Sequence, residues 1–252
     1  MMKKSMESLN LNHVCKTYNC DFEKGAMNAA QRVFKYSICG CFFHYSQSEW
    51  RHVQFNGLTK KFFSFDPNFR LAFKKVQALA YIPIEGVIDG FLLIQKESPK
   101  SFNPILKWLE NNYIGKLEGC STTARKEPRF PIKVWNVYER VKKDLPRTNN
   151  LVESWYSVIN ADTRKNLTVN KTVELCRKEQ GNMEAEFQKC ISGDKQPKPP
   201  NSRRTREENI KRIVMNYKRA HLADNLLGLA NNMGEVKIRN LAKTVQHLFI
   251  YI

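Results

Sequence analysis

The sequence has no long hydrophobic run and no secretory leader. Its longest wholly apolar stretches span only a few residues, such as residues 91–94, whereas a membrane-spanning helix needs about 20 apolar residues. Residues 1–12 contain no apolar segment of the kind that a signal peptide carries. We therefore predict a soluble, intracellular protein that does not enter a membrane.

Cysteines in a disulfide pattern are also missing, and acidic residues are few. The seven cysteines are odd in number, and their spacing does not form a disulfide framework, which fits a reducing compartment. Aspartate and glutamate number 24 against 42 lysines and arginines, so the net charge is +18. Such a chain attracts polyanions, of which nucleic acid is the commonest. This balance favours a nucleic-acid partner over an anionic membrane or a plain basic surface, and we expect no small-molecule substrate.

The hydrophobic pattern near the N-terminus changes period twice. Residues 13–20 predict the end of a strand, and the apolar residues of 26–34 recur at helical spacing. Residues 36–43 are short, dense and aromatic or small, and they predict a buried strand. The order strand, helix, strand is typical of a fragment of an α/β layer.

The next hundred residues, about 45–145, are predicted to be almost wholly helical. A helix is expected at 45–54, and another begins at Asp66-Pro67, where the aspartate caps the helix and proline takes its first position. Further helices are predicted at 84–97 and 103–113 from their apolar faces. The whole chain is therefore expected to be predominantly helical.

The last hundred residues divide at a polar, proline-rich linker. Before it we predict a long helix over about 168–191, and the linker itself is residues 193–202. Beyond it we predict a tail of two amphipathic helices, at roughly 204–232 and 237–251. The sequence shows no internal repeat.

Three local patterns contain the residues that bear chemistry. They are Asp-Phe-Glu at 21–23, Gly-Cys-Phe-Phe-His at 40–44, and Arg-Thr-Asn-Asn-Leu-Val-Glu-Ser-Trp at 147–155. In this order and spacing the patterns resemble the transposase domain of Mutator-like elements (MULE). Ala-Leu-Ala-Tyr-Ile-Pro at 78–83 also resembles that family, and the likeness covers about residues 10–181.

The resemblance implies an RNase H-like α/β core interrupted by a large all-α insertion. It divides the chain into a partial transposase domain, the end of a helix with the linker, and a basic helical tail. These parts are residues 1–181 (with the insertion at about 45–145), 182–202 and 203–252.

The resemblance also implies a DDE enzyme, in which three carboxylates hold two divalent metal ions for DNA strand transfer. Carboxylate oxygens are the ligands that Mg²⁺ and Mn²⁺ prefer. Asp21 would be the second acid, at a strand end, and Glu153 the third. The first acid of the family lies several tens of residues upstream, whereas 20 residues precede Asp21 here. We therefore expect a truncated, catalytically incomplete relative of these enzymes.

The sequence is compatible with three functions. The first is a transposase-derived nuclear protein that binds DNA, with self-association as a further expectation. The alternative is a non-catalytic nuclear module that binds DNA or protein through the helical insertion and the basic tail. The third is an enzyme completed by a separately encoded N-terminal half.

The two acids have structural interpretations as well. Asp21 is suited to cap the helix that begins near Glu23. Asn150 and Glu153 have the spacing of a capping box, in which the glutamate reaches back to the first residue of the helix. Metal binding and capping therefore remain alternatives for both acids.

Cys41 and His44 have the spacing of two zinc ligands. A structural zinc site needs four ligands, and two residues three apart in one strand point to opposite faces. The pair converges only if the strand ends near Phe43. Packing is the alternative, and we favour it over zinc.

The start of the tail is strongly basic. These side chains are Arg203, Arg204, Arg206, Lys211 and Arg212. They are candidates for contacts with DNA phosphates or for a nuclear address. The alternative is the solvated first turns of a helix.

Overall fold

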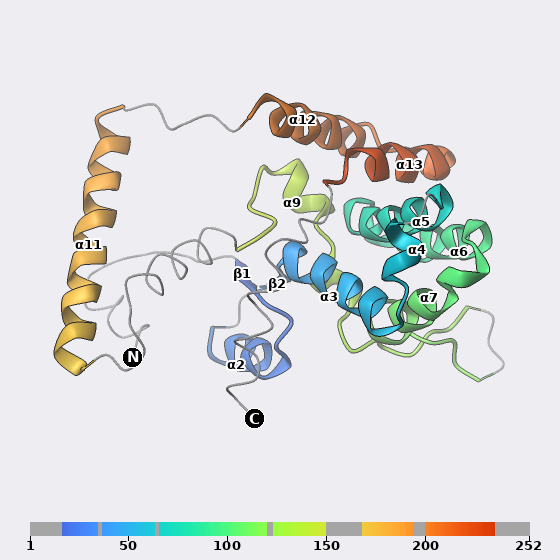
Figure 1. The fold of residues 1–252 in the computed structure, drawn as a ribbon, viewed down its shortest axis with the longest axis horizontal. Helices are drawn as coiled ribbons and strands as arrows, with labels where there is room; N and C mark the ends of the chain where they lie inside the picture. The colour runs from blue at the N-terminus through green and yellow to red at the C-terminus, as the bar shows by residue number, and fades with distance from the viewer. Residues whose placement is uncertain are drawn as a thin grey trace.

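The computed structural model describes residues 17–34, 37–63, 66–119, 123–149, 168–193 and 200–234. This part of the chain is predominantly helical, with one small two-stranded sheet, as Figure 1 shows. The helical part of the predicted fold class is thus confirmed. None of the helices described here is long and apolar enough to cross a membrane.

The elements follow one another in a simple order. The first part contains β1 (Thr17–Cys20), α2 (Lys24–Phe34), β2 (Ser37–Gly40), α3 (Phe42–Phe55), α4 (Thr59–Phe63) and α5 (Pro67–Ala78). Two 3-10 turns, η1 (Leu79–Tyr81) and η2 (Ile84–Gly86), lead into α6 (Val87–Glu97). Then follow η3 (Lys100–Phe102), α7 (Asn103–Leu109), the π-helical turn η4 (Glu110–Ile114), α8 (Ile132–Trp135) and α9 (Tyr138–Lys142). The last are α11 (Val169–Ile191), α12 (Asn201–Met215), η5 (Arg219–His221) and α13 (Leu222–Asn232).

The two strands are parallel and are joined by α2, as the expected strand–helix–strand order requires. Their register pairs Thr17 with Ser37 and Cys20 with Gly40. The second strand is shorter than the predicted 36–43, because α3 already begins at Phe42. The Phe42 ring packs against the buried ring of Tyr81, with centroids 4.9 Å apart. Phe42, an apparent strand residue in the sequence, is therefore the first residue of a helix and packs against a distant ring.

Aromatic rings form the centre of the helical body built from α3 to α9. The rings of Tyr45 and Trp135 stack with centroids 5.0 Å apart and planes 4° from parallel. Tyr113 packs edge-on against Tyr45, and Trp135 donates from Nε1 to the Tyr113 carbonyl. At the edge of this body α5 begins as predicted, because the Asp66 side chain accepts hydrogen bonds from the first amides of the helix.

The segment after the linker packs onto this helical body. α13 lies against α5 and α6, and α12 lies against α9. Ile210, Val214, Leu226 and Leu229 are all buried in the same hydrophobic cluster as the core of the body. The segment 200–234 therefore shares the core.

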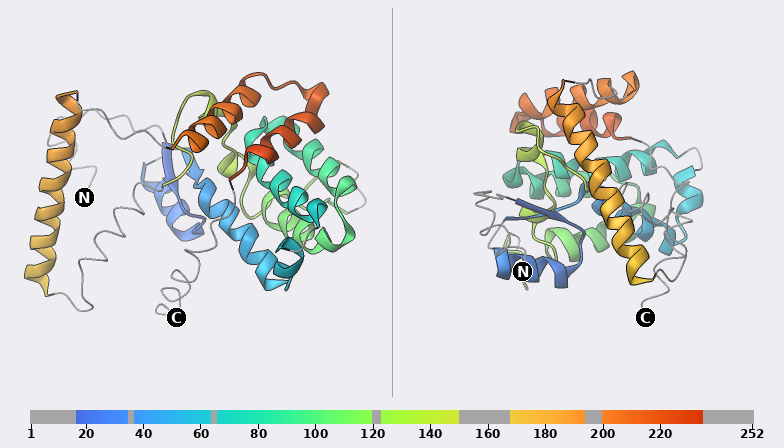
Figure 2. Two further views of the ribbon diagram at one scale, coloured as in Figure 1. Left: turned by 45° about the horizontal axis from the view of Figure 1, so that its top comes forward. Right: turned by 90° about the vertical axis from the view of Figure 1, so that its left-hand side faces the viewer.

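The prediction of one helix over 204–232 is wrong. The chain leaves the helix at Met215 and starts a new one at Leu222, so that both apolar faces reach the same core. Tyr217 lies in the bend and packs against Tyr138. By contrast, the long helix predicted at 168–191 is confirmed as α11, which stands apart from the helical body in Figures 1 and 2.

Candidate functional site

The parallel strands end side by side and bring two of the predicted site residues to one edge. Cys20 and Gly40 are the last residues of β1 and β2 and are paired in register. Asp21 and Cys41 follow them directly, and the Cys41 amide donates to the Cys20 carbonyl at 2.8 Å. The carboxyl edge of parallel strands is where ligands bind in α/β folds. This edge is the candidate site.

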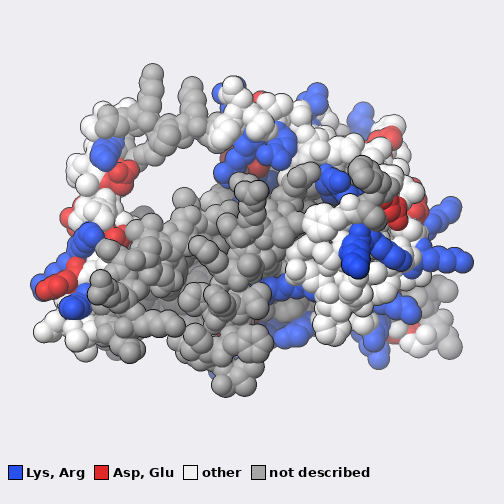
Figure 3. Space-filling model, in the orientation of Figure 1, with Lys and Arg blue, Asp and Glu red and all other residues white. Residues whose placement is uncertain are grey.

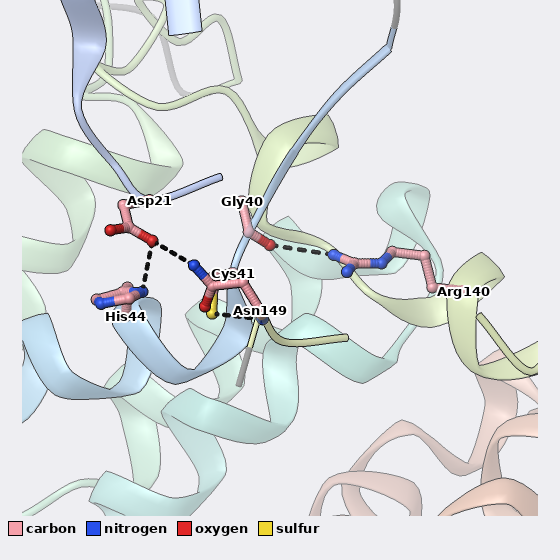
Figure 4. A network of polar contacts seen from close by, with 6 residues as sticks. All are labelled: Asp21, Gly40, Cys41, His44, Arg140 and Asn149. Atoms are coloured by element: carbon pink, nitrogen blue, oxygen red, sulfur yellow. Dashed lines mark hydrogen bonds and ion pairs between the residues drawn. The ribbon is translucent and has the colours of Figure 1, made fainter. Parts of the chain in front are cut away.

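Asp21 contacts two side chains from distant parts of the chain (Figure 4). Its Oδ1 forms an ion pair with His44 Nδ1 at 2.9 Å and accepts a hydrogen bond from Asn149 Nδ2 at 2.8 Å. His44 lies in the first turn of α3, and Asn149 lies 128 residues after Asp21. These contacts do not involve α2, so the structure does not support capping of α2 by Asp21.

The Asp21 carboxylate and the His44 imidazole stabilise each other in their charged forms. The hydrogen bond from His44 lowers the pKa of Asp21, against the opposing effect of partial burial, and the bond from Asn149 lowers it further. Burial alone would lower the pKa of His44, but its interactions with Asp21 and Cys41 raise that pKa to about 10. At neutral pH an imidazolium therefore faces a carboxylate.

Cys41 lies beneath this pair and is fully buried. It is the residue immediately before α3, and its Sγ accepts a hydrogen bond from the Asn149 amide at 3.5 Å. Because the strand ends at Gly40, Cys41 and His44 lie one helical turn apart and interact. Cys41 and His44 therefore approach each other, as expected if the strand ended before His44.

The neighbouring cysteines are neutral thiols. Burial, followed by the charge of Asp21, raises the pKa of Cys20 to about 11, and burial raises the pKa of Cys39. Zinc prefers thiolates. Within the described ranges no three histidine, cysteine, aspartate or glutamate side chains are grouped so as to hold a metal ion. Zinc at Cys41 and His44 therefore gains no third ligand from this part of the chain.

A hard divalent cation fits this edge better than zinc does. The Asp21 side chain is about half exposed, with 53% of its surface accessible. Beside it, Oδ1 of Asn149 is buried and has no hydrogen-bond partner among the described residues. Carboxylate and amide oxygens are the ligands that such cations take. One carboxylate and one amide oxygen are fewer than a stable site needs.

The other predicted acid, Glu153, lies outside the described residues, as does its capping partner Asn150. The segment that leads to them, however, contacts the candidate site directly. The Phe42 amide donates to the Arg147 carbonyl at 2.9 Å, and Asn149 makes its two contacts with Cys41 and Asp21. The chain is therefore held against the site up to the last described residue before Glu153.

Two arginines hold this segment in place. Arg140 donates from Nη1 to the Gly40 carbonyl at 3.0 Å and from Nε to the Pro146 carbonyl at 2.9 Å. Arg147 donates to the Tyr81 hydroxyl at 3.0 Å and forms an ion pair with Glu207 of α12. The site is thereby connected to the helical body and to the segment after the linker.

The sequence alone did not assign roles to Asn149, Arg140 or Arg147. Asn149 and Arg147 belong to the pattern at 147–155, and this pattern was the only signal that could have found them. No short motif marks Arg140, because its partners lie in other segments.

The five basic residues predicted to bind DNA lie on α12, and two of them pair with acidic side chains of the protein. Lys211 pairs with Asp144 at 2.6 Å, and Arg204 approaches Glu208 at 3.5 Å on the same helix. Arg206 donates to the Ser202 carbonyl. Arg203 and Arg212 are exposed. The side chains thus share one helix, but only part of their charge points outward without an acidic partner.

No protein-family model, curated protein or solved structure matches this chain. The assignment of a function therefore depends on the site and on the surface charges described above.

Proposed function

We propose that this protein is related to the DDE strand-transfer enzymes of Mutator-like elements. In this proposal Asp21 and Glu153 are two acids of an RNase H-like metal site. The partner is DNA, the cofactor is Mg²⁺ or Mn²⁺, and the protein acts in the nucleus.

One observation carries the proposal: Asn149 donates a hydrogen bond to the Asp21 carboxylate at 2.8 Å. Asn149 belongs to the same sequence pattern as Glu153 and precedes it by four residues. Four residues of chain span at most about 14 Å. The pattern that contains the third acid therefore approaches the second acid, although about 130 residues separate them.

The arrangement of the elements also supports the proposal. Asp21 directly follows a strand that pairs in parallel with β2. The helices α3 to α9 then intervene before the chain returns to the strand ends at Asn149. An α/β core with a helical insertion between the second and third acids would have this order.

Each side chain has a distinct role in the proposed site. Asp21 and Glu153 would bind the divalent ion, and Asn149 would orient the Asp21 carboxylate. His44 neutralises Asp21 through their 2.9 Å contact. A bound ion would supply the activation of a water or a 3′-hydroxyl for attack on a phosphodiester.

Metal binding is tested by titrating Mn²⁺ into the labelled protein and following line broadening by NMR. Paramagnetic Mn²⁺ should broaden the signals of His44 and Asn149 before those of α13. Asp21→Asn should abolish this selective broadening. Asp224→Asn is the matched control, because Asp224 is an exposed acid on α13 with 83% of its side chain accessible. If Mn²⁺ broadened the signals of His44 and Asn149 equally in Asp21→Asn and in the wild-type protein, the proposed metal site would be refuted.

Activity is tested on supercoiled plasmid with Mg²⁺ or Mn²⁺. Any metal-dependent nicking should disappear in Asp21→Ala, while DNA affinity should stay the same or rise slightly because a negative charge is lost. Glu153→Gln should behave like Asp21→Ala, with Glu186→Gln on α11 as its control. Nicking that survives Asp21→Ala would show that the acids are wrongly assigned.

A non-catalytic DNA-binding module is the second candidate. The packing of α12 and α13 onto the core favours it, since the basic helix is held rigidly. Affinity for duplex DNA should then fall steeply with added salt. Arg203→Gln and Arg212→Gln should each reduce the slope of that dependence, and a flat salt response would exclude this function.

A further inference from the structure

Three aromatic rings form a stack at the surface between α3 and α7. The His52 ring lies on the Trp108 ring with centroids 4.8 Å apart and planes 15° from parallel. The Phe55 ring also stacks with His52, at a centroid distance of 6.0 Å and 20° from parallel. We refer to Phe55, His52 and Trp108 as the Phe55 stack.

The inner two rings of the stack are fixed in place. Burial lowers the pKa of His52, and its ring also bonds to the Pro104 carbonyl. Trp108 is half-buried and packs edge-on against Tyr113 of the core. The stack is therefore an extension of the aromatic core to the surface, and its orientation is set by the core.

Phe55 is not explained by packing, because 85% of its surface is exposed. An exposed phenyl ring forgoes the hydrophobic stabilisation that burial would bring. A second exposed ring, Phe63 with 54% of its surface accessible, lies on the following helix α4. Two large apolar rings thus face solvent near the corner where α3 is followed by α4.

The surroundings of these rings are positively charged. Arg51, Lys60 and Lys107 are exposed and belong to α3, α4 and α7. The only acid in these three helices is Glu49, which is fully buried. Figure 3 shows that lysine and arginine side chains outnumber acidic ones over this part of the molecule.

We infer that the Phe55 stack and the cations around it bind single-stranded nucleic acid, with a base stacking on the outer face of Phe55. An aromatic ring accepts any base, because every base has a flat π-face. The lysines and the arginine would follow the phosphates. A duplex keeps its bases inside and offers the ring no free face, so the occupant is a single strand.

This inference rests on the proposed function, which makes nucleic acid the expected polymer. The Phe55 stack then indicates a single strand rather than a duplex. It adds a binding surface that is separate from the strand ends and from α12. In a strand-transfer protein this surface would hold the unpaired strand.

The test measures the affinity of the full chain for a 20-nucleotide oligothymidylate at several salt concentrations. Phe55→Ala should weaken binding roughly fivefold or more, and Phe55→Trp should restore it. Lys107→Gln should instead lower the salt slope by about 0.7. Leu92→Ala on α6 is the control, because Leu92 is also a large exposed apolar side chain, with 47% of its surface accessible.

The outcomes separate the two proposals. Equal affinity in wild type and Phe55→Ala would overturn the inference, as would no binding of the oligonucleotide at low salt. If Asp21→Asn does not change Mn²⁺ broadening but Phe55→Ala weakens oligonucleotide binding, the metal site fails and the surface stands. A 20-base-pair duplex should bind equally to wild type and Phe55→Ala, and a loss there as well would contradict stacking of a free base.

Discussion

Arg140 donates a hydrogen bond from Nη1 to the carbonyl oxygen of Gly40, 100 residues earlier in the chain, at 3.0 Å. The same guanidinium donates to the Pro146 carbonyl. One buried side chain thus joins the end of β2 to the segment that carries Asn149 to Asp21. The candidate site depends on this connection, although Arg140 does not contact Asp21.

Replacing Arg140 should destabilise the protein by about 2 kcal/mol, because the buried Gly40 carbonyl and the partly buried Pro146 carbonyl lose their donor. Arg140→Met keeps much of the apolar stem and removes the donors. Lys142→Met is the control, since Lys142 forms an exposed pair with Glu139 and lies over the Tyr138 ring, and exposed pairs contribute between zero and about 1 kcal/mol. Urea unfolding measures both, and equal midpoints for the two variants would contradict the role given to Arg140.

The pH dependence of the Asp21–His44 pair follows from its two pKa shifts. His44 has a pKa of about 10, above its ordinary 6.5, so its contribution to stability is complete below pH 6.5 and disappears as pH rises through about 10. Asp21 has a lowered pKa, so its contribution is lost as pH falls through that lowered value. NMR titration of the His44 ring should show the raised pKa, and Asp21→Asn should bring it down. If the pKa of the His44 ring were the same in Asp21→Asn, a group other than Asp21 would be responsible for raising it.

The dependence expected for Glu49 is opposite to that of Asp21 in the pH range between the unfolded and the folded pKa of Glu49. It is fully buried, and burial raises its pKa well above the ordinary 4.5, so the folded protein keeps it protonated. The unfolded chain ionises above that value, and stability should therefore fall by about 1.4 kcal/mol per pH unit for this one group. Glu49→Gln should remove this fall and raise the melting temperature at pH 7 more than at pH 4. Parallel curves for the two proteins would mean that Glu49 ionises in the fold.

Gly115 should not tolerate a side chain. Its φ is +98°, and a Cβ there would lie 2.1 Å from the carbonyl oxygen of Lys126. Gly115→Ala should cost about 2–4 kcal/mol, through strain and the displaced backbone. Gly119→Ala is the matched control, because Gly119 also has a positive φ but no atom within 4 Å of the added carbon. It should cost about 1 kcal/mol, and similar losses for both would contradict the close approach at Gly115.

The local features of this protein could be predicted from short stretches of its sequence. The order of apolar residues predicted β1 and α2, a long helix was predicted where α11 lies, and Asp66-Pro67 predicted the start of α5, because periodicity and capping involve residues within one or two turns. It also placed Asp21 at a strand end. Its errors were a strand continued through Phe42 and one helix over 204–232.

The remaining features depend on contacts between segments that no local pattern in the sequence connects. The Phe42 ring packs on Tyr81 from the first position of α3, and α12 and α13 pack on each other. Asn149 reaches Asp21 across 128 residues. The free energy of such contacts comes from burial and from pairing polar groups at a fixed distance, and both exist only after the helical body has formed.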